Sequence, residues 1–416
     1  MKLNSIAIPS HMKLRHFDKN EIYDIHRSKI EKLFYNDCFA DTFPYLNSLK
    51  QIDYLTLNKK DEEKIKKATE QLHSIFISAT EHVLKNKSLY KLFNVSENNW
   101  RLIGENFNRT KNDYFYGRMD LGFSFDLNTI KLFEYNTGLC GDIYDTTDFQ
   151  NSIFNYFVMN NPNNTFTQKS LHSGYRLISQ LGKRWKELSS KCNNKTVYFI
   201  ASSTDKEEQL VLSSIFQGLK THNIQYKLSY DTNPIIESRN GVLYDKETKE
   251  KIDILYKTHP WYCIFRNLNC DLKNCKSIYR YCLNKKTKIV EPMWKTVMGN
   301  KALLPYVYSL NRSNPYLIPS SFDPFDDCFE DDEYIIEKGL TGRGSMSTRT
   351  IKRKDIKERK NNVIYQRIFT ENKYKGKYYI MGSYIVGKEF SGMFIKQSEK
   401  MINEYSCNVI PVRILI

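Results

Sequence analysis

Apolar and polar residues alternate with two different periods along the chain, and the period changes near residue 110. Between residues 59 and 93, apolar side chains recur every three or four residues on a charged background. This spacing predicts an amphipathic helix, or a helical pair, packed on a larger body. From about residue 112, apolar and polar residues tend to alternate. The segments "DYFYGRMDLGFSFD" and "TIKLFEYN", joined by "LNT", therefore predict a hairpin of two short strands.

The middle of the chain mixes amphipathic and continuously apolar segments. The stretch 170–188 has helical spacing, 196–203 ("TVYFIASS") is a continuous apolar run, and 205–222 has helical spacing again. Two further apolar runs follow, "IQYKLSY" and "IDILYKTH". A buried strand, a helix and further strands in this order predict an α/β unit with a partly parallel sheet.

The last third alternates short apolar runs with turns that contain glycine or proline. The runs are "DEYIIEKGL", "NVIYQRIF", "YYIMGSYIVG" and "FSGMFIKQS". This pattern predicts an α+β region dominated by an antiparallel sheet. The predicted fold class is therefore mixed, α/β followed by α+β.

The composition argues against some classes of protein but does not indicate a function. The chain is 40% hydrophobic and 26% charged, and no window holds the roughly 18 consecutive apolar residues that a membrane span requires. The N-terminal segment has no apolar core of the signal-peptide kind, so we expect a cytoplasmic protein without membrane contact. The nine cysteines match no zinc spacing and are expected to be ordinary thiols.

The net charge of +16 allows an anionic partner but does not identify one. Nucleic acids and small polyanions such as nucleotides both fit a basic protein. Lysine is spread along the whole chain, and no recognisable nucleic-acid-binding module is present, so we do not expect a nucleic-acid partner. The sequence carries no signal for an oligomeric state.

The predicted hairpin carries a polar pattern of its own. Arg118 and Asp120 are two residues apart on the first strand, as are Glu134 and Asn136 on the second. Residues two apart share a face, so an antiparallel pair would present an arginine, two carboxylates and a carboxamide together. Such oxygen ligands suit Mg²⁺, and arginine suits a carboxylate or phosphoryl group. On this segment alone, a solvated polar face is the simpler interpretation.

A glycine-rich segment, "EKGLTGRGS" (337–345), leaves three interpretations open: a surface turn, part of a basic face, or a lid over phosphates. Glycine amides can approach an anion without a side chain in the way. The spacing matches neither a Walker A loop nor a dinucleotide-binding fingerprint. Lys295 and Lys301 precede an apolar stretch, and Lys338 leads into the glycines. These lysines either face solvent, as most lysines do, or form a clamp for a nucleotide.

The order of these pieces resembles the glutathionylspermidine synthase family of ATP-grasp ligases. The resemblance runs from about residue 116 to 394 and is carried by seven motifs in the family's order. They are "YGRMD", "LFEYN", "EPMWK", "NKALLP", "EKGLTGRGS", "IYQRIF" and "YIMGSYIVGKEFSGM". The resemblance implies an ATP-grasp fold with a preceding α/β substrate domain and a helical N-terminal segment.

The resemblance also implies roles for particular residues. Arg118 would contact the reacting carboxylate and phosphoryl group. Magnesium ligands would be Asp120, Glu134 and Asn136. Contacts to ATP would come from Lys301, Lys338, Gln366 and a mobile loop containing Gly342, Arg343, Gly344 and Ser345. An acidic pair, Glu207 and Glu208, would receive a polyamine.

The implied activity is amide formation between a glutathione-like peptide and a spermidine-like polyamine, with ATP and Mg²⁺, through an acyl phosphate. Three parts are expected: a helical N-terminal segment (1–100), an α/β substrate and metal-binding region (101–290) and an ATP-grasp nucleotide-binding region (291–416). About a hundred residues before the first motif are too few for the amidase domain of bifunctional members, so we expect none.

Departures from the family pattern lie mainly where substrates would bind. Leu139, Cys140 and Gly141 replace a small, hydroxyl-rich run, and Tyr262 stands where many members have glutamate. Asn408 replaces an arginine near the C-terminus, and Lys396 with Gln397 replaces an Arg-Glu pair. Two alternatives therefore stay open: a ligase for another peptide or amino acid and another amine, or a nucleotide-binding protein of this fold that has lost catalysis.

Overall fold

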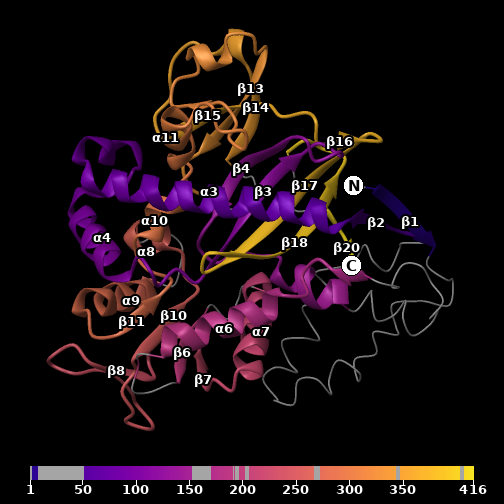
Figure 1. The fold of residues 1–416 in the computed structure, drawn as a ribbon. Helices are drawn as coiled ribbons and strands as arrows, with labels where there is room; N and C mark the ends of the chain where they lie inside the picture. Colours follow the sequence, from indigo (N-terminus) through magenta and orange to yellow (C-terminus); the bar gives the residue numbers. More distant parts are fainter. Residues whose placement is uncertain are drawn as a thin grey trace.

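A computed structural model describes residues 2–7, 51–151, 170–190, 192, 196–201, 206–266, 272–342, 347–402 and 407–416. These residues build a central antiparallel sheet crossed by one long helix. A smaller antiparallel sheet lies above it, and a parallel sheet with its helices lies below it in the view of Figure 1.

The central sheet has the strand order β19-β18-β17-β3-β4, with β16 paired to β17. Its neighbouring strands all run antiparallel. They are β3 (Tyr116–Phe123), β4 (Ile130–Asn136), β16 (Lys373–Tyr374), β17 (Lys377–Val386), β18 (Glu389–Ser398) and β19 (Asn408–Ile410). The hairpin predicted from the alternating pattern is confirmed as β3 and β4.

The long helix α3 (Lys59–Lys85) covers one face of this sheet. It begins with a capping box, in which Asn58 and Asp61 exchange side-chain and backbone hydrogen bonds. Its apolar stripe is buried against the sheet, and Thr69 Oγ1 lies 2.7 Å from Ser383 Oγ on β17. The predicted helix at 59–93 is confirmed as α3 followed by the 3₁₀ turn η3 (Lys87–Leu92).

The upper sheet has the order β12-β15-β13-β14 and is antiparallel. Its strands are β12 (Ser320–Ser321), β13 (Tyr334–Gly339), β14 (Thr348–Lys352) and β15 (Val363–Arg367), and α11 (Leu303–Leu310) lies beside it. A small apolar core of Phe329, Ile335 and Tyr365 holds it together. The two strands predicted here from "DEYIIEKGL" and "NVIYQRIF" are confirmed.

The lower sheet is parallel, with the order β11-β10-β6-β7. Its strands are β6 (Val197–Ile200), β7 (Tyr226–Ser229), β10 (Ile254–Lys257) and β11 (Lys288–Val290), and its helices are α6 (Leu177–Ser189), α7 (Lys206–Thr221), α8 (Trp261–Arg266) and α9 (Leu272–Asn284). Helices α6 and α7 touch through glycines, since a Cβ on Gly182 would lie 2.2 Å from Gly218 O. The predicted parallel α/β unit is confirmed.

A fourth sheet joins segments far apart in the chain, in the order β1-β2-β20-β5. Its strands are β1 (Lys2–Ala7), β2 (Gln51–Leu57), β5 (Ser170–His172) and β20 (Val412–Leu415). The other elements are α4 (Glu97–Thr110), η4 (Asp145–Phe149), β8 (Ile235–Glu237), β9 (Leu243–Asp245), α10 (Lys295–Met298), η5 (Asp327–Phe329) and η6 (Arg353–Asp355).

Two details differ from the predicted elements. The helix predicted at 170–188 begins only at Leu177, because residues Ser170–His172 pair with β20 as strand β5. The N-terminal segment predicted as helical also contains β1 and β2, and β2 pairs in parallel with β20. Strands from both the 101–290 and the 291–416 regions share the central sheet, and the division into three domains stays a prediction. No helix in the described part of the chain is long and apolar enough to cross a membrane.

Candidate active site

The free face of the β3–β4 hairpin gathers the polar residues that the sequence predicted to lie together. The register places Arg118 opposite Asn136 and Asp120 opposite Glu134. A β-bulge follows Asp120, and Phe133 is the extra residue on β4. The opposite face packs on α3, so these four side chains are turned away from the core formed with that helix.

Arg118 is held by several oxygen atoms at once. Its Nε donates to Asp120 Oδ1 at 2.7 Å, and its Nη2 donates to Asp120 Oδ2 at 3.0 Å. Its Nη1 donates to Gly141 O at 3.2 Å and also to Asp142 Oδ2. The guanidinium therefore forms a two-pronged ion pair with Asp120 and a second ion pair with Asp142.

The two carboxylates of the hairpin have different charge environments. Burial raises the pKa of Asp120 against the charge of Arg118, and Glu134 raises it further. Burial would also raise the pKa of Glu134, but Lys301, Lys338 and a hydrogen bond from Asn136 outweigh it and hold this pKa below its usual range. Asn136 Nδ2 lies 3.2 Å from Asp120 Oδ2 and 3.1 Å from Glu134 Oε1. The Asn136 amide thus contacts both carboxylates of the hairpin.

Two predicted lysines reach this cluster from elsewhere in the chain. Lys301 precedes α11, and its Nζ lies 3.3 Å from Glu134 Oε2. Lys338, on β13 of the upper sheet, donates to Gln366 Oε1 at 2.7 Å and to the bulge carbonyl of Phe133 at 3.0 Å. Burial lowers the pKa of Lys338 to about 8. Lys338 and Gln366 therefore join the upper sheet to the central hairpin at the candidate site.

The glycine-rich segment connects β13 to β14. Gly342 has a φ of +145°, a conformation that favours glycine, and Gly339 N donates to Ser347 O at 2.9 Å. Lys301 N donates to Leu340 O at 2.9 Å, so the described base of this connection lies beside a predicted nucleotide lysine. Arg343, Gly344 and Ser345 lie outside the described residues, and their role as a lid stays a prediction.

The structure separates the two predicted polyamine-binding glutamates. Glu207 lies in the first turn of α7, is exposed, and packs its carboxylate against Gly141, where a Cβ would lie 1.8 Å from Glu207 Oε1. Glu208 is buried and accepts a hydrogen bond from Thr258 Oγ1 beside the carboxyl end of β10. Only Glu207 lies against the loop that holds Arg118.

Sequence reasoning missed Asp142 and gave no role to Asp145, and both follow β4. Asp142 accepts hydrogen bonds from Arg118 and from Lys396 on β18, the latter at 2.9 Å. Burial raises the pKa of Asp145 to about 7, and Asp142 adds to this effect. The acidic residues after "GLCG" were a visible signal, but their partner Lys396 is 254 residues away in the chain from Asp142.

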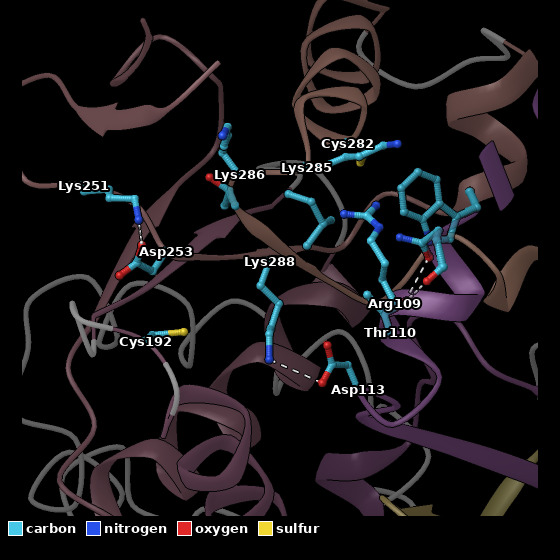
Figure 2. Close-up of a pocket in the computed structure, with 14 residues that line it drawn as sticks. Arg109, Thr110, Asp113, Cys192, Lys251, Asp253, Cys282, Lys285, Lys286 and Lys288 are labelled. Atoms are coloured by element: carbon cyan, nitrogen blue, oxygen red, sulfur yellow. Dashed lines mark hydrogen bonds and ion pairs between the residues drawn. The ribbon is translucent and has the colours of Figure 1, made fainter. Parts of the chain in front are cut away.

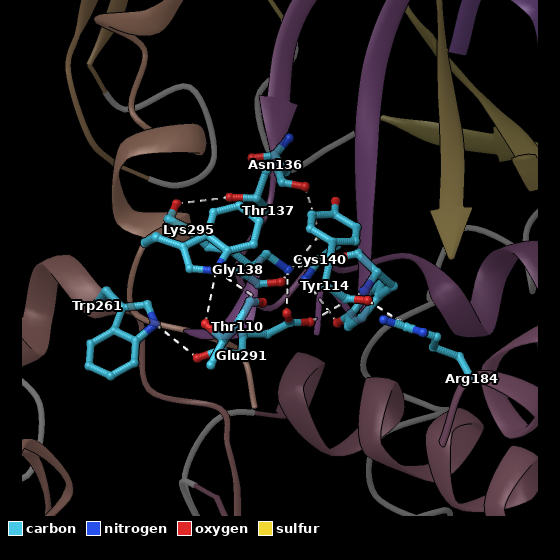
Figure 3. Close-up of polar contacts among 12 residues, drawn as sticks. Thr110, Tyr114, Asn136, Thr137, Gly138, Cys140, Arg184, Trp261, Glu291 and Lys295 are labelled. Carbon is cyan, nitrogen blue, oxygen red and sulfur yellow. Dashed lines mark hydrogen bonds and ion pairs between the residues drawn. The ribbon is translucent and has the colours of Figure 1, made fainter. Parts of the chain in front are cut away.

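Lys295, the third candidate lysine, is buried in the core and has a structural role there. It forms an ion pair with Glu291 at 2.5 Å, and both side chains are almost fully buried. Its Nζ donates to Tyr116 O at 2.8 Å, and its carbonyl accepts from Thr137 Oγ1 at 3.1 Å. Figure 3 shows this network between β3, the end of β4 and the segment after β11. Lys295 thus holds the two ends of the hairpin that carries the site.

Cys140 lies in the same loop and is unsuited to nucleophilic chemistry. It is buried, and its Sγ lies 3.0 Å from Asn136 O. Burial raises the pKa of its thiol to about 12, so the reactive thiolate is disfavoured. Its backbone N–H donates to Tyr116 Oη at 3.1 Å, which fixes the loop rather than exposing the sulfur.

A separate cavity of about 380 Å³ lies at the amino-terminal ends of β10 and β11 (Figure 2). Its lining is basic, but Lys251 pairs with Asp253 at 2.6 Å and Lys288 pairs with Asp113 at 3.3 Å. Lys288 also donates to Leu188 O in the last turn of α6 at 3.3 Å. Helix C-termini attract cations, and α4 and α9 also end at this cavity. We therefore assign its positive charge a structural role.

The chain is similar in sequence to a family of known ligases. The glutathionylspermidine synthase preATP-grasp family matches residues 25–415. The bifunctional glutathionylspermidine synthetase/amidase of Escherichia coli (strain K12) is 22% identical over 391 residues, covering 86% of this chain and 59% of that protein. A putative acid–amine ligase of Haemophilus influenzae is 22% identical over 385 residues and covers 90% of each chain.

Two further likenesses concern another synthetase and the fold. The trypanothione synthetase of Crithidia fasciculata is 22% identical over 366 residues, covering 83% of this chain and 54% of that protein. The chain therefore spans little more than half the length of the synthetases it matches. A solved glutathione synthetase-like effector of Globodera pallida, in its apo form, superposes with a TM-score of 0.53 at 11% identity, covering 87% of this chain and 88% of that one. With the family match, this confirms the predicted ATP-grasp fold class.

Proposed function

The chain belongs to the glutathionylspermidine synthase family, and on this premise we propose that it is an ATP-dependent ligase joining a carboxylate to an amine. The observation that carries the proposal is the junction of two sheets at one charged site. Lys338 and Gln366 on the upper sheet meet Glu134 and the Phe133 carbonyl on the central hairpin, with Arg118 beyond them. Cations and carboxylates meeting at such a junction suit phosphoryl transfer from a nucleotide.

ATP is proposed to lie between the two sheets. Lys338 and Lys301 would contact its phosphates, since both are cations beside Glu134. Gln366, which is buried beside Lys338, would contact the adenine side. The connection that contains Gly342 and the predicted Arg343, Gly344 and Ser345 would close over the phosphates and exclude water from the reacting groups.

Magnesium is proposed to be held by Asp120, Glu134 and Asn136. These residues fit the ion because two carboxylates and an amide oxygen are the hard ligands it prefers. The Asn136 amide lies within hydrogen-bond distance of both carboxylates through Nδ2, and a half-turn of the amide would present its oxygen to the ion instead. The raised pKa of Asp120 fits as well, since a cation placed there would favour its charged form. When bound, the ion would neutralise charge on the phosphates of ATP.

Arg118 is proposed to act on the acid substrate. Its guanidinium would orient the substrate carboxylate toward the γ-phosphate and neutralise charge as the phosphoryl group transfers. The product of this step would be an acyl phosphate, and an amine would then attack its carbonyl carbon and release phosphate. The attacking nitrogen must first lose a proton. A carboxylate near Gly141, such as Glu207, would help to bind the nitrogens of the polyamine that stay charged.

We propose a glutathione-like peptide as the acid and a spermidine-like polyamine as the amine. The proposed polyamine would be bound by Glu207 rather than by Glu208, because Glu208 is buried against Thr258. The acid end must fit a loop in which Cys140 is buried and Gly141 packs against Glu207. A different peptide or amino acid remains the alternative acid, because Leu139–Gly141 departs from the family's hydroxyl-rich run.

The test is phosphate release by the purified protein with Mg·ATP, with glutathione and spermidine supplied separately and together, followed by mass spectrometry. We expect release only with both, and a product mass equal to their sum less water. If nucleotide binds but no phosphate is released with both compounds present, this substrate pair is rejected. Absence of nucleotide binding would contradict the proposed function itself. We also propose a cytoplasmic location, which a reporter fusion in fractionated cells would test.

A further inference from the structure

Asp142 connects two cations that come from distant parts of the chain. Its Oδ2 accepts a hydrogen bond from Lys396 Nζ at 2.9 Å and another from Arg118 Nη1. The residue follows Gly141 and has a φ of +64°, a left-handed conformation that asparagine and aspartate tolerate better than most residues. Asp142 is therefore a bridging carboxylate whose backbone is specially placed.

One N–H group of Arg118 has no hydrogen-bond partner among the residues that the structure describes. A guanidinium has five N–H groups. Among the described residues, Asp120 takes one from Nε and one from Nη2, while Asp142 and Gly141 take both from Nη1. The remaining N–H is on Nη2, next to the Asp120 oxygen in the proposed metal set. Asp120 and Asp142 thus hold the group from two sides and fix where this last donor is directed.

The two cations also share an aromatic neighbour. The Arg118 guanidinium carbon lies 5.7 Å from the centroid of the Phe394 ring, and Lys396 Nζ lies 5.5 Å from the same centroid. The ring has room on this face because position 382 is glycine, where a Cβ would lie 2.0 Å from the Phe394 ring. Phe394 and Asp142 together keep two like charges close, which mutual repulsion would otherwise oppose.

Asp142 is ionised in this arrangement. Burial would raise its pKa, but the charges of Lys396 and Arg118 outweigh burial and lower it. The loop that carries it is fixed independently, because Tyr384 Oη donates to Gly141 O and Cys140 N donates to Tyr116 Oη. A charged group on a fixed loop is a rigid support for the two cations.

We propose that Asp142 is a positioning residue that holds Arg118 and Lys396 as a cation pair for an oxyanion. Each cation keeps N–H donors for a ligand: one on Arg118, and two on the Lys396 ammonium, which makes one hydrogen bond among the described residues. The ligand is the carboxylate or transferring phosphoryl group of the reaction, so this inference rests on the proposed function. Arg118 and Lys396 contact the ligand, and Asp142 acts through them.

The test compares Asp142→Asn with wild type. Asparagine keeps the left-handed backbone but removes the charge that both cations share. The matched control is Asp126→Asn, an exposed aspartate in the turn of the same hairpin. Thermal melting and backbone amide spectra of both variants establish that they are folded.

The first readout is nuclear magnetic resonance of protein labelled with ¹⁵N-arginine, in which Arg118→Lys identifies the Arg118 signals. Wild type and Asp126→Asn should show slow rotation of the Arg118 guanidinium, because Asp120 holds Nε and Nη2 while Gly141 and Asp142 hold both Nη1 hydrogens. Asp142→Asn should show faster rotation than either, because the charged partner of Nη1 is lost while the two bonds to Asp120 remain. Unchanged rotation would overturn the proposal, and this readout needs no substrate.

The second readout is phosphate release with glutathione, spermidine and Mg·ATP. Asp142→Asn should lower kcat about tenfold to a hundredfold, with the KM for ATP changed less than about twofold, as for other supporting residues of active sites. Changed rotation with unchanged kcat would overturn the functional part of the proposal. If wild type does not turn over this pair, the substrate assignment fails, and the guanidinium readout alone then decides whether Asp142 positions Arg118.

Discussion

The two faces of the β3–β4 hairpin are built from the same alternating sequence, yet they hold their polar groups in opposite ways. On the face against α3, His73 Nδ1 lies 2.7 Å from Tyr135 Oη, which lies 2.8 Å from Tyr114 Oη. These three groups are held in their neutral forms, and the Lys295 ammonium lies 4.2 Å from the centroid of the Tyr114 ring. On the other face, Arg118, Asp120 and Glu134 are charged or ionisable groups that hold one another.

The difference shows which face is available for chemistry. A neutral buried network is complete, because each group satisfies a neighbour and no charge is left over. The charged face retains oxygen atoms and N–H donors that can take a ligand, and it tolerates partial burial because opposite charges are in contact. The comparison predicts that substitutions on the two faces affect different quantities, activity on one and stability on the other.

The largest effect is expected from Glu134→Ala on the charged face. It removes a proposed metal ligand and the partner of Lys301, and we expect phosphate release to fall about a hundredfold to a thousandfold, as when other groups that stabilise developing charge are removed. The fold should be retained, because the side chain is outside the core formed with α3. Asp126→Asn is the control, and turnover close to wild type in Glu134→Ala would contradict the metal assignment.

The opposite face should respond through stability. Leu121→Ala leaves a cavity at a fully buried position between the hairpin and α3, and it should reduce the free energy of unfolding by about 2–5 kcal/mol. Urea denaturation followed by circular dichroism measures the loss. The activity per folded molecule should stay near wild type, and a large drop in kcat with unchanged stability would break the comparison.

A smaller effect is expected where the upper sheet meets the charged face. Lys338→Met should raise the KM for ATP about tenfold to a hundredfold, because one charge-assisted contact to phosphate is lost, about 1.5–3 kcal/mol. Isothermal titration with a non-hydrolysable ATP analogue measures the same loss directly. Lys354→Met, an exposed lysine of the same region, is the control. Equal affinities in both variants would remove Lys338 from the nucleotide site.

The free energy of unfolding should depend on pH through His73, which lies on the face against α3. Burial, with the charges of Lys295 and Lys388, lowers the pKa of His73 to about 3, below the usual value near 6.5. Between these two values the unfolded chain binds a proton that the folded chain does not, so acidification through this range lowers the free energy of unfolding.

His73→Gln should weaken this dependence while keeping a hydrogen-bonding group near Tyr135. Urea unfolding between pH 7 and pH 4.5 would measure it, with the exposed His82→Gln on the same helix as the matched control. A pH dependence equal to wild type in His73→Gln would show that this histidine is not held neutral.

The smallest effect is expected at the amine end. Glu207→Gln should raise the KM for spermidine about two- to fivefold, since an exposed charge contributes up to about 1 kcal/mol. Glu208→Gln should leave this KM nearly unchanged, because its carboxylate is turned to Thr258. Steady-state kinetics of the two variants compare them. A larger effect at Glu208 would reverse our assignment of the amine site.

Local periodicity was enough to predict the hairpin and the polar residues that gather on one of its faces. Strand periodicity is local, so residues two apart had to share a face, and Arg118, Asp120, Glu134 and Asn136 meet as expected. The parallel order of β6 and β10 also followed from apolar runs separated by a helix. The order of the motifs identified the family and, through that resemblance, pointed to Lys301 and Lys338.

The folded structure was needed to show which charged residues lie together at the candidate site and which are buried away from it. Lys295 and Lys338 look alike in sequence, but packing gives Lys295 a carboxylate partner in the core and places Lys338 between two sheets. The ion pair between Asp142 and Lys396 also could not be predicted from the sequence, because the two residues are 254 positions apart and meet only in the folded chain. Charge pairs form through space, and sequence patterns describe only neighbours along the chain, so these contacts needed the folded molecule.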